Sequence, residues 1–230
     1  HNANWGEDMV AAIARTGDGL PANMIPFPIN AIAQIGLDFL LTAHAYGAET
    51  VTVLADPTFT NETNILKNEI ALAETILAGL GYGGDRGALI EYIDPDALQN
   101  YLSALKPKNS LPASNFLAMG RKRSVIGQAL KALYMGAPEP VDTIPLDPGA
   151  AFGTVIIDTA GCTLCLSCVG ACPTGALKDN PDRPELSFSE TQCVQCGLCR
   201  NTCPESVIEL EPRLSFLDTA LTHQVVKAEK

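Results

Sequence analysis

Two short stretches, GCTLCLSCVGACP (161–173) and QCVQCGLCRNTCP (192–204), contain all 8 cysteines of this 230-residue chain. In each stretch the cysteines follow the spacing C-x2-C-x2-C-x3-C-P. The match extends outward at an offset of 31 residues, aligning VIIDTAGCTLCLSCVGACPTGAL (155–177) with LSFSETQCVQCGLCRNTCPESVI (186–208). Each half is predicted to run as strand, cysteine loop, short helix and strand. This duplication predicts a pseudo-two-fold fold with two equivalent sites.

The spacing is that of bacterial iron–sulfur proteins, in which three cysteines of one loop bind one cluster and the fourth cysteine binds the other cluster. We therefore predict two [4Fe–4S] clusters whose ligands are exchanged between the halves. The first cluster is assigned to Cys162, Cys165, Cys168 and Cys203. The second cluster is assigned to Cys193, Cys196, Cys199 and Cys172. No catalytic residue is predicted.

Zinc and disulfides are the alternative uses of these cysteines. Zinc sites commonly pair two CxxC units across a long gap, and they do not require a CxxCxxC loop followed by a CP, twice over. Disulfide-bonded secreted proteins rarely place every cysteine in so short a part of a long chain. The spacing therefore favours clusters, which we expect the apolar neighbours Leu164, Val169, Val194 and Leu198 to shield from water.

Over residues 153–212 the sequence resembles the bacterial two-cluster ferredoxin family, and both cysteine motifs match in full. The resemblance implies an α+β ferredoxin-like domain that carries two [4Fe–4S] clusters and passes electrons one at a time. Because neither motif has its middle cysteine replaced, we expect two complete four-iron clusters.

The composition limits the choice of partner. The chain is 47% hydrophobic and carries 15 basic and 26 acidic residues, a formal net charge of −11. This charge argues against nucleic acid or an anionic membrane as a partner. It favours basic patches on redox proteins such as a dehydrogenase, a flavoprotein or a hydrogenase subunit. No membrane span is predicted, because the most apolar stretch, residues 31–54, is broken by polar side chains.

The first half of the chain alternates helical and strand patterns. Helices are predicted over 29–47, 62–80, 94–105 and 121–136, and strands over 50–55 and 87–93. The third of these helices has Asp94 at the N-cap and Pro95 at its first position. The alternation predicts an α/β domain with a small parallel sheet and flanking helices.

Residues 29–105 also resemble the delta subunit of methyl-viologen-reducing hydrogenase, which occurs fused to heterodisulfide reductase components. The shared features are a helix ending in YGA before VTVLA (46–55), a long helix over 64–80, and EYIDPDALQNYL (91–102). The resemblance implies a small α/β domain that mediates electron transfer and binds a [2Fe–2S] cluster through cysteines. Residues 1–161 contain no cysteine, so that cluster cannot form here. We expect a degenerate scaffold that docks a partner or holds a neighbouring domain.

The domain division predicted from these patterns has four parts. They are an α/β domain over 1–117, a helix and Pro-rich linker over 118–150, the ferredoxin domain over 151–212 and a helical tail over 213–230. The chain begins at His1 without a signal-peptide pattern, and we interpret this end as a cut edge. Thiolate-bound clusters predict a reducing cytoplasmic location.

Three functions remain open from the sequence. The first is an electron carrier with no catalysis of its own, and the second is the iron–sulfur segment of a larger oxidoreductase. The third is a structural or sensory iron–sulfur scaffold without reversible electron transfer.

Overall fold

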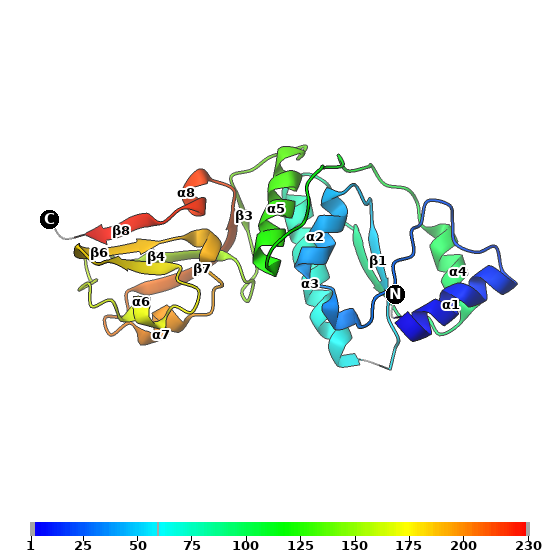
Figure 1. Ribbon diagram of the computed structural model, residues 1–230, viewed down its shortest axis with the longest axis horizontal. Coiled ribbons are helices and arrows are strands. Elements are labelled where there is room, and N and C mark those ends of the chain that lie inside the picture. Colours follow the sequence, from blue (N-terminus) through cyan, green and yellow to red (C-terminus); the bar gives the residue numbers. More distant parts are fainter. Residues whose placement is uncertain (1–2, 59, 229–230) are drawn as a thin grey trace. The chain divides into compact units, whose positions relative to one another are not determined.

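The computed structural model (Figure 1) describes residues 3–58 and 60–228, and it divides into two compact units, His1–Pro140 and Val141–Lys230. The expected cut edge at His1 and the last two residues of the predicted tail lie outside the described residues. The predicted linker segment 118–150 is divided between the units, because its helix belongs to the first unit and its following strand to the second.

The first unit contains most of the helices of the chain. Its elements are α1 (Ala3–Thr16), η1 (Ile32–Gln34), α2 (Leu37–Ala45), β1 (Val51–Leu54), α3 (Thr60–Gly79), β2 (Gly87–Ile90), α4 (Pro95–Ala104) and α5 (Lys122–Met135). β1 and β2 form a parallel pair whose register runs from Val51 opposite Gly87 to Leu54 opposite Ile90. The prediction of a small parallel sheet is confirmed.

The core of the first unit forms where α2 contacts both α3 and α5. Leu40 and Leu41 of α2 and Ile76 and Leu77 of α3 are at most 1% exposed. With Leu37 of α2 and Ala73 of α3, which are also buried, each helix has apolar residues at spacings of three and four, so each set lies on an inward face. Burying an apolar side chain of this size contributes about 1.5–3 kcal/mol, so these contacts stabilise the unit.

The helix predicted over 29–47 begins later in the structure. The backbone at Gly36 is extended, with φ −126° and ψ −174°, and α2 starts only at Leu37. The Leu37 N–H donates to Glu69 Oε2 of α3 at 2.8 Å. The carboxylate of Glu69, which lies far away in the sequence, therefore caps the N-terminus of α2. The apolar periodicity predicted an earlier start because it contains no information about this cap.

A buried arginine fixes the turn between α3 and β2. Arg86 is 4% exposed, and its guanidinium donates to the carbonyl oxygens of Tyr82 at 2.9 Å, Glu49 at 2.9 Å and Asn109 at 3.1 Å. These three acceptors come from three separate segments. One side chain thus connects the end of α3, the start of β1 and the connection after α4.

The second unit holds the cysteines and most of the strands. Its elements are β3 (Thr143–Pro145), β4 (Gly153–Ile157), α6 (Ser167–Ala171), β5 (Leu177–Asn180), β6 (Arg183–Phe188), η2 (Glu190–Gln192), α7 (Leu198–Thr202), β7 (Ile208–Ser215), α8 (Asp218–Leu221) and β8 (Gln224–Ala228). All strand pairs are antiparallel, in two sheets ordered β3-β7-β4 and β5-β6-β8. Figure 1 shows α6 and α7 next to each other on one side of these strands.

The prediction of a helical tail over 213–230 is wrong. β7 continues to Ser215, α8 is a single turn, and β8 pairs with β6 along Gln224–Ala228. Two β-branched residues, Val225 and Val226, favour a strand here. The exposed edge of β6 provides the partner that decides between the two conformations.

A helix can span a membrane only if it is long and apolar enough to cross the bilayer. Among residues 3–58 and 60–228, no helix combines the length and the apolar character that crossing a bilayer requires.

We predict that Arg86→Lys destabilises the first unit by about 2–4 kcal/mol. A lysine ammonium lacks the planar fork of the guanidinium and leaves some of the three carbonyls without a donor. The measurement is thermal unfolding of the full chain followed by far-ultraviolet circular dichroism, with visible absorbance reporting separately on the second unit.

Arg121→Lys, at an exposed position, is the matched control, and its unfolding should stay within about 0.5 kcal/mol of the wild type. Equal unfolding temperatures for Arg86→Lys and Arg121→Lys would contradict the role given to Arg86.

Candidate metal centre

The strands of the second unit are exchanged between the two halves of the duplicated sequence. β4, from the first half, pairs with β7 of the second, and β6, from the second half, pairs with β5 of the first. The registers correspond at the offset of 31 residues, because Ile157 faces Ile208 and Phe188 faces Leu177. Each half therefore donates its last strand to the other half.

Because of this exchange, each half places one cysteine beside the cysteine loop of the other half. Cys172 and Cys203 end the short helices α6 and α7 and lie five residues before β5 and β7, respectively. Since β5 lies beside β6 and β7 beside β4, each of these cysteines comes close to the loop of the other half.

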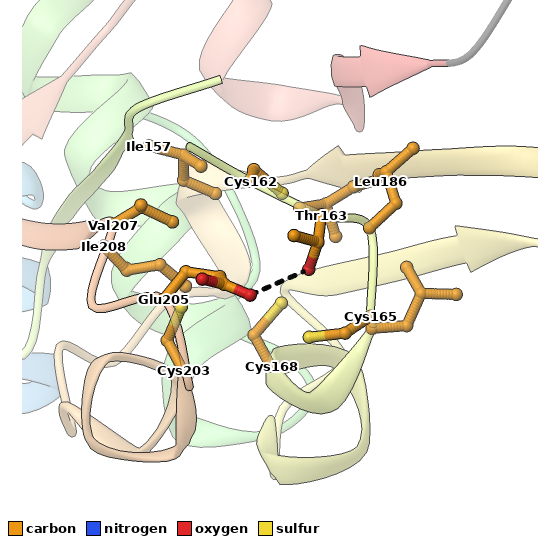
Figure 2. Close-up of a pocket in the computed structure, with 12 residues that line it drawn as sticks. Ile157, Cys162, Thr163, Cys165, Cys168, Leu186, Cys203, Glu205, Val207 and Ile208 are labelled. Atoms are coloured by element: carbon orange, nitrogen blue, oxygen red, sulfur yellow. Dashed lines mark hydrogen bonds between the residues drawn. The ribbon is translucent and has the colours of Figure 1, made fainter. Parts of the chain in front are cut away.

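The first pocket combines thiols from both halves. It is lined by Cys162, Cys165 and Cys168 of the first loop and by Cys203 from the second half. Figure 2 shows their sulfur atoms turned toward a common space. The empty volume is about 360 Å³, part of which is open to solvent. The walls are otherwise mainly apolar and include Ile157, Leu164, Leu166, Leu186, Val207 and Ile208.

The second pocket mirrors the first. It is lined by Cys193, Cys196 and Cys199 of the second loop and by Cys172 from the first half, and its empty volume is about 330 Å³. Its apolar walls include Val155, Ala176, Leu177, Phe188, Val194 and Leu210. Of the residues expected to shield the sites, Leu164 and Val194 line the pockets. Val169 packs on the surrounding core, and Leu198 is 45% exposed.

Left-handed backbone shapes both cysteine loops in the same way. Leu164 and Gln195 have φ of 56° and 53°, and Leu166 and Gly197, which precede α6 and α7, have φ of 59° and 76°. The two pairs are equivalent under the offset of 31. A left-handed conformation costs a non-glycine residue about 1–2 kcal/mol. Because both Leu164 and Leu166 adopt it, the shape of the first loop must be imposed by packing.

Burial changes the acidity of the thiols. Desolvation raises the pKa of Cys168 to about 11 and also raises the pKa values of Cys193 and Cys199. Cys165 is exposed, and its hydrogen bond with Ser167 lowers its pKa. Without a bound metal, the buried thiols are protonated at neutral pH.

The donor set fits iron–sulfur clusters. Each pocket offers four thiols inside a largely apolar wall, which is the ligand chemistry of a [4Fe–4S] cluster. Across residues 3–58 and 60–228, no three His, Cys, Asp or Glu side chains converge closely enough to hold a single metal ion. The four thiols of each pocket instead line a larger empty volume.

Among the described residues, no histidine lines either pocket. His44 is buried in the first unit and its Nδ1 lies 2.9 Å from the Ala48 carbonyl oxygen. His223 Nε2 lies 3.1 Å from the Gly175 carbonyl oxygen, and His1 is outside the described residues.

Sequence reasoning missed the polar residues that distinguish the two pockets. Thr163 and Glu205 line the first pocket, where Thr163 Oγ1 donates to Glu205 Oε1 at 3.4 Å, the dashed line in Figure 2. Gln195 and Thr174 line the second. Comparing the two halves position by position, in addition to aligning their cysteines, would have revealed these differences.

Two known sequences or families are similar to parts of this chain. The family model of the 4Fe-4S dicluster domain matches residues 161–208. This segment is a ferredoxin-type 4Fe–4S domain. Pyruvate synthase subunit PorD of Thermotoga maritima is 34% identical over 62 residues, which cover 27% of this chain and 62% of that protein. The chain thus spans less than two thirds of this relative. The family match supports the binding of iron–sulfur clusters in this segment.

We predict that clusters load faster as the pH rises. Cysteines bind iron as thiolates, and the raised pKa values of Cys168, Cys193 and Cys199 leave these thiols protonated at neutral pH. Below the pKa, the thiolate fraction of each group rises about tenfold per pH unit. The initial rate of anaerobic reconstitution, followed by visible absorbance, should therefore rise at least about tenfold from about pH 6.5 to about pH 8.5. A rate independent of pH over this range would contradict the prediction.

Proposed function

We propose that this chain binds two [4Fe–4S] clusters and passes electrons through them one at a time. The proposed ligands of the first cluster are Cys162, Cys165, Cys168 and Cys203. The proposed ligands of the second are Cys193, Cys196, Cys199 and Cys172. The observation that carries the proposal is that each of two pockets is lined by three thiols of one loop and one thiol of the other half.

The apolar walls and the exposed cysteines have complementary roles in this proposal. A [4Fe–4S] cluster supplies reversible one-electron transfer. The buried side chains of Leu177, Leu186 and Ile208 keep water away from the inner side of each pocket. Cys165 and Cys196 are exposed, one at each pocket. They place one edge of each site at the surface, where a redox partner can approach.

The charge of the chain suits partners with basic docking surfaces. The formal net charge is −11, and a cluster with four thiolates adds further negative charge. Electrostatic attraction would steer such a protein toward positively charged patches. The related protein of Thermotoga maritima is a pyruvate synthase subunit, so we propose that this chain likewise serves as the electron-transfer part of an oxidoreductase, in the cytoplasm. The partner would be a dehydrogenase, a flavoprotein or a hydrogenase subunit.

For the first unit we propose a docking role. Its α/β arrangement is consistent with the resemblance to the delta subunit of methyl-viologen-reducing hydrogenase, and it has no cysteine with which to bind a cluster of its own. It would hold a partner or a neighbouring domain near the iron–sulfur unit.

Paired cysteine variants test the exchange of ligands. Cys162→Ala combined with Cys203→Ala should damage only the first site and leave about four irons per chain, compared with about eight in the wild type. Cys162→Ala combined with Cys172→Ala should damage both sites and leave no complete cluster. Iron and sulfide analysis of anaerobically purified protein provides the measurement.

The two pairs serve as controls for each other, because each removes one loop cysteine and one cysteine that ends a helix. If the Cys162/Cys172 pair kept one complete cluster and the Cys162/Cys203 pair kept none, each half would bind its own cluster and the assignment would be wrong.

Reversible reduction separates an electron carrier from a structural or sensory scaffold. In protein-film voltammetry of the full chain, we expect reversible one-electron waves on the negative side of the range of roughly −700 to +450 mV that such clusters span. Clusters that decompose on reduction, or that cannot be reduced, would favour the scaffold.

A further inference from the structure

The two pockets have equivalent cysteines and mostly equivalent apolar walls, and they differ at a few polar positions. At the offset of 31, Leu164 corresponds to Gln195, Thr163 to Val194, Glu205 to Thr174 and Ser167 to Leu198. The cysteines and most apolar lining residues correspond as well. Any difference in behaviour between the two sites therefore originates mainly in these side chains and in the charges near them.

Gln195 places a side-chain donor beside a cysteine sulfur. Its backbone N and its side-chain Nε2 each lie 3.5 Å from Cys193 Sγ. The same Nε2 donates to the Thr154 carbonyl oxygen of β4 at 2.8 Å. A carbonyl oxygen can only accept a hydrogen bond, so the atom that faces it is the amide nitrogen. Leu164, the equivalent residue of the first loop, has no side-chain donor.

The backbone of β4 leaves room for this amide. A Cβ atom on Gly153 would come within 2.4 Å of the Glu211 carbonyl oxygen, 2.6 Å of Gln195 Cδ and 2.7 Å of Gln195 Nε2, so a larger residue would displace the amide or the backbone of β7. Gln195 Oε1 is buried and has no hydrogen-bond partner within the described part of the chain. Because an unpartnered buried oxygen is unfavourable, the bonds made by the nitrogen must determine how the amide is oriented.

Other polar side chains lie near the cysteines of both sites. Ser167 Oγ lies 3.5 Å from Cys165 Sγ in the first, and Thr174 Oγ1 lies 3.7 Å from Cys172 Sγ in the second. Glu205 lines the first pocket, and Lys227 Nζ donates to the Cys162 carbonyl oxygen, so this site has one charge of each sign close by. The Gln195 amide is a side-chain N–H donor that the equivalent position of the first loop lacks.

We propose that Gln195 makes the two sites unequal by raising the reduction potential of the second site, an inference that rests on the proposed function. A hydrogen bond to sulfur stabilises the more negative, reduced state, and such bonds tune cluster potentials. One electron taken from an external reductant then settles first at the site bound by Cys193, and a second electron goes to the first site. Gln195 is a positioning residue that acts through the Cys193 sulfur.

The test is a potentiometric titration of the full chain loaded with clusters, using dithionite as the reductant and electron paramagnetic resonance as the readout. Wild type should show two separate midpoints. Gln195→Met keeps the side-chain length and removes the donor. It should lower the higher midpoint by ~59 mV, which for one electron is a change of about tenfold in the ratio of reduced to oxidised clusters at a given potential. The lower midpoint should stay unchanged. Gln224→Leu, which removes an amide that donates to Thr222 Oγ1 in the same unit, should shift neither.

The outcomes separate this inference from the proposed function. If Gln195→Met keeps about eight irons and both wild-type midpoints, the inference is wrong while electron transfer through two clusters stands. If wild type lacks two reducible clusters, the proposed function fails first. Should Gln195→Met load poorly, Gln195→Leu, which copies the equivalent residue of the first loop and has no donor, should lower the same midpoint. An unchanged midpoint in that variant would equally overturn the role of Gln195.

Discussion

The exchange of strands between the halves of the second unit is the constraint on which the candidate site depends. β4 pairs with β7, and β5 pairs with β6, in registers that correspond at the offset of 31. If each half folded on itself, Cys172 and Cys203 would stay beside their own loops. Because the last strands cross over, each pocket gains its fourth thiol from the other half. Backbone pairing thus determines the composition of each thiol set.

The sequence predicted the site better than it predicted the surroundings. Cysteine spacing and internal duplication are properties of the chain itself, so the pocket membership of Cys172 and Cys203 could be anticipated. The alternating pattern of the first half likewise anticipated the parallel pairing of β1 with β2. The tail was mispredicted because its strand depends on the free edge of β6. Glu69 and Arg86 were missed because their partners lie far away in sequence.

The duplicated frame also explains how two similar sites can come to differ. The backbone and the apolar walls are repeated in both sites, so a single polar substitution can make the two sites differ. Gln195 uses the space left by Gly153 and reaches Cys193, whereas Leu164 contributes only apolar surface. The thiols show the same dependence on surroundings, since desolvation raises the pKa of the buried Cys168 while a hydrogen bond lowers the pKa of the exposed Cys165.

The crossed thiol sets are tested most directly by anomalous X-ray diffraction at the iron absorption edge, using crystals of the full chain loaded under anaerobic conditions. The account predicts two compact iron positions. Cys203 would be bound to the iron beside Cys162, and Cys172 to the iron beside Cys193. Iron beside Cys162 that is bound by Cys172, or a single metal ion at either position, would contradict it.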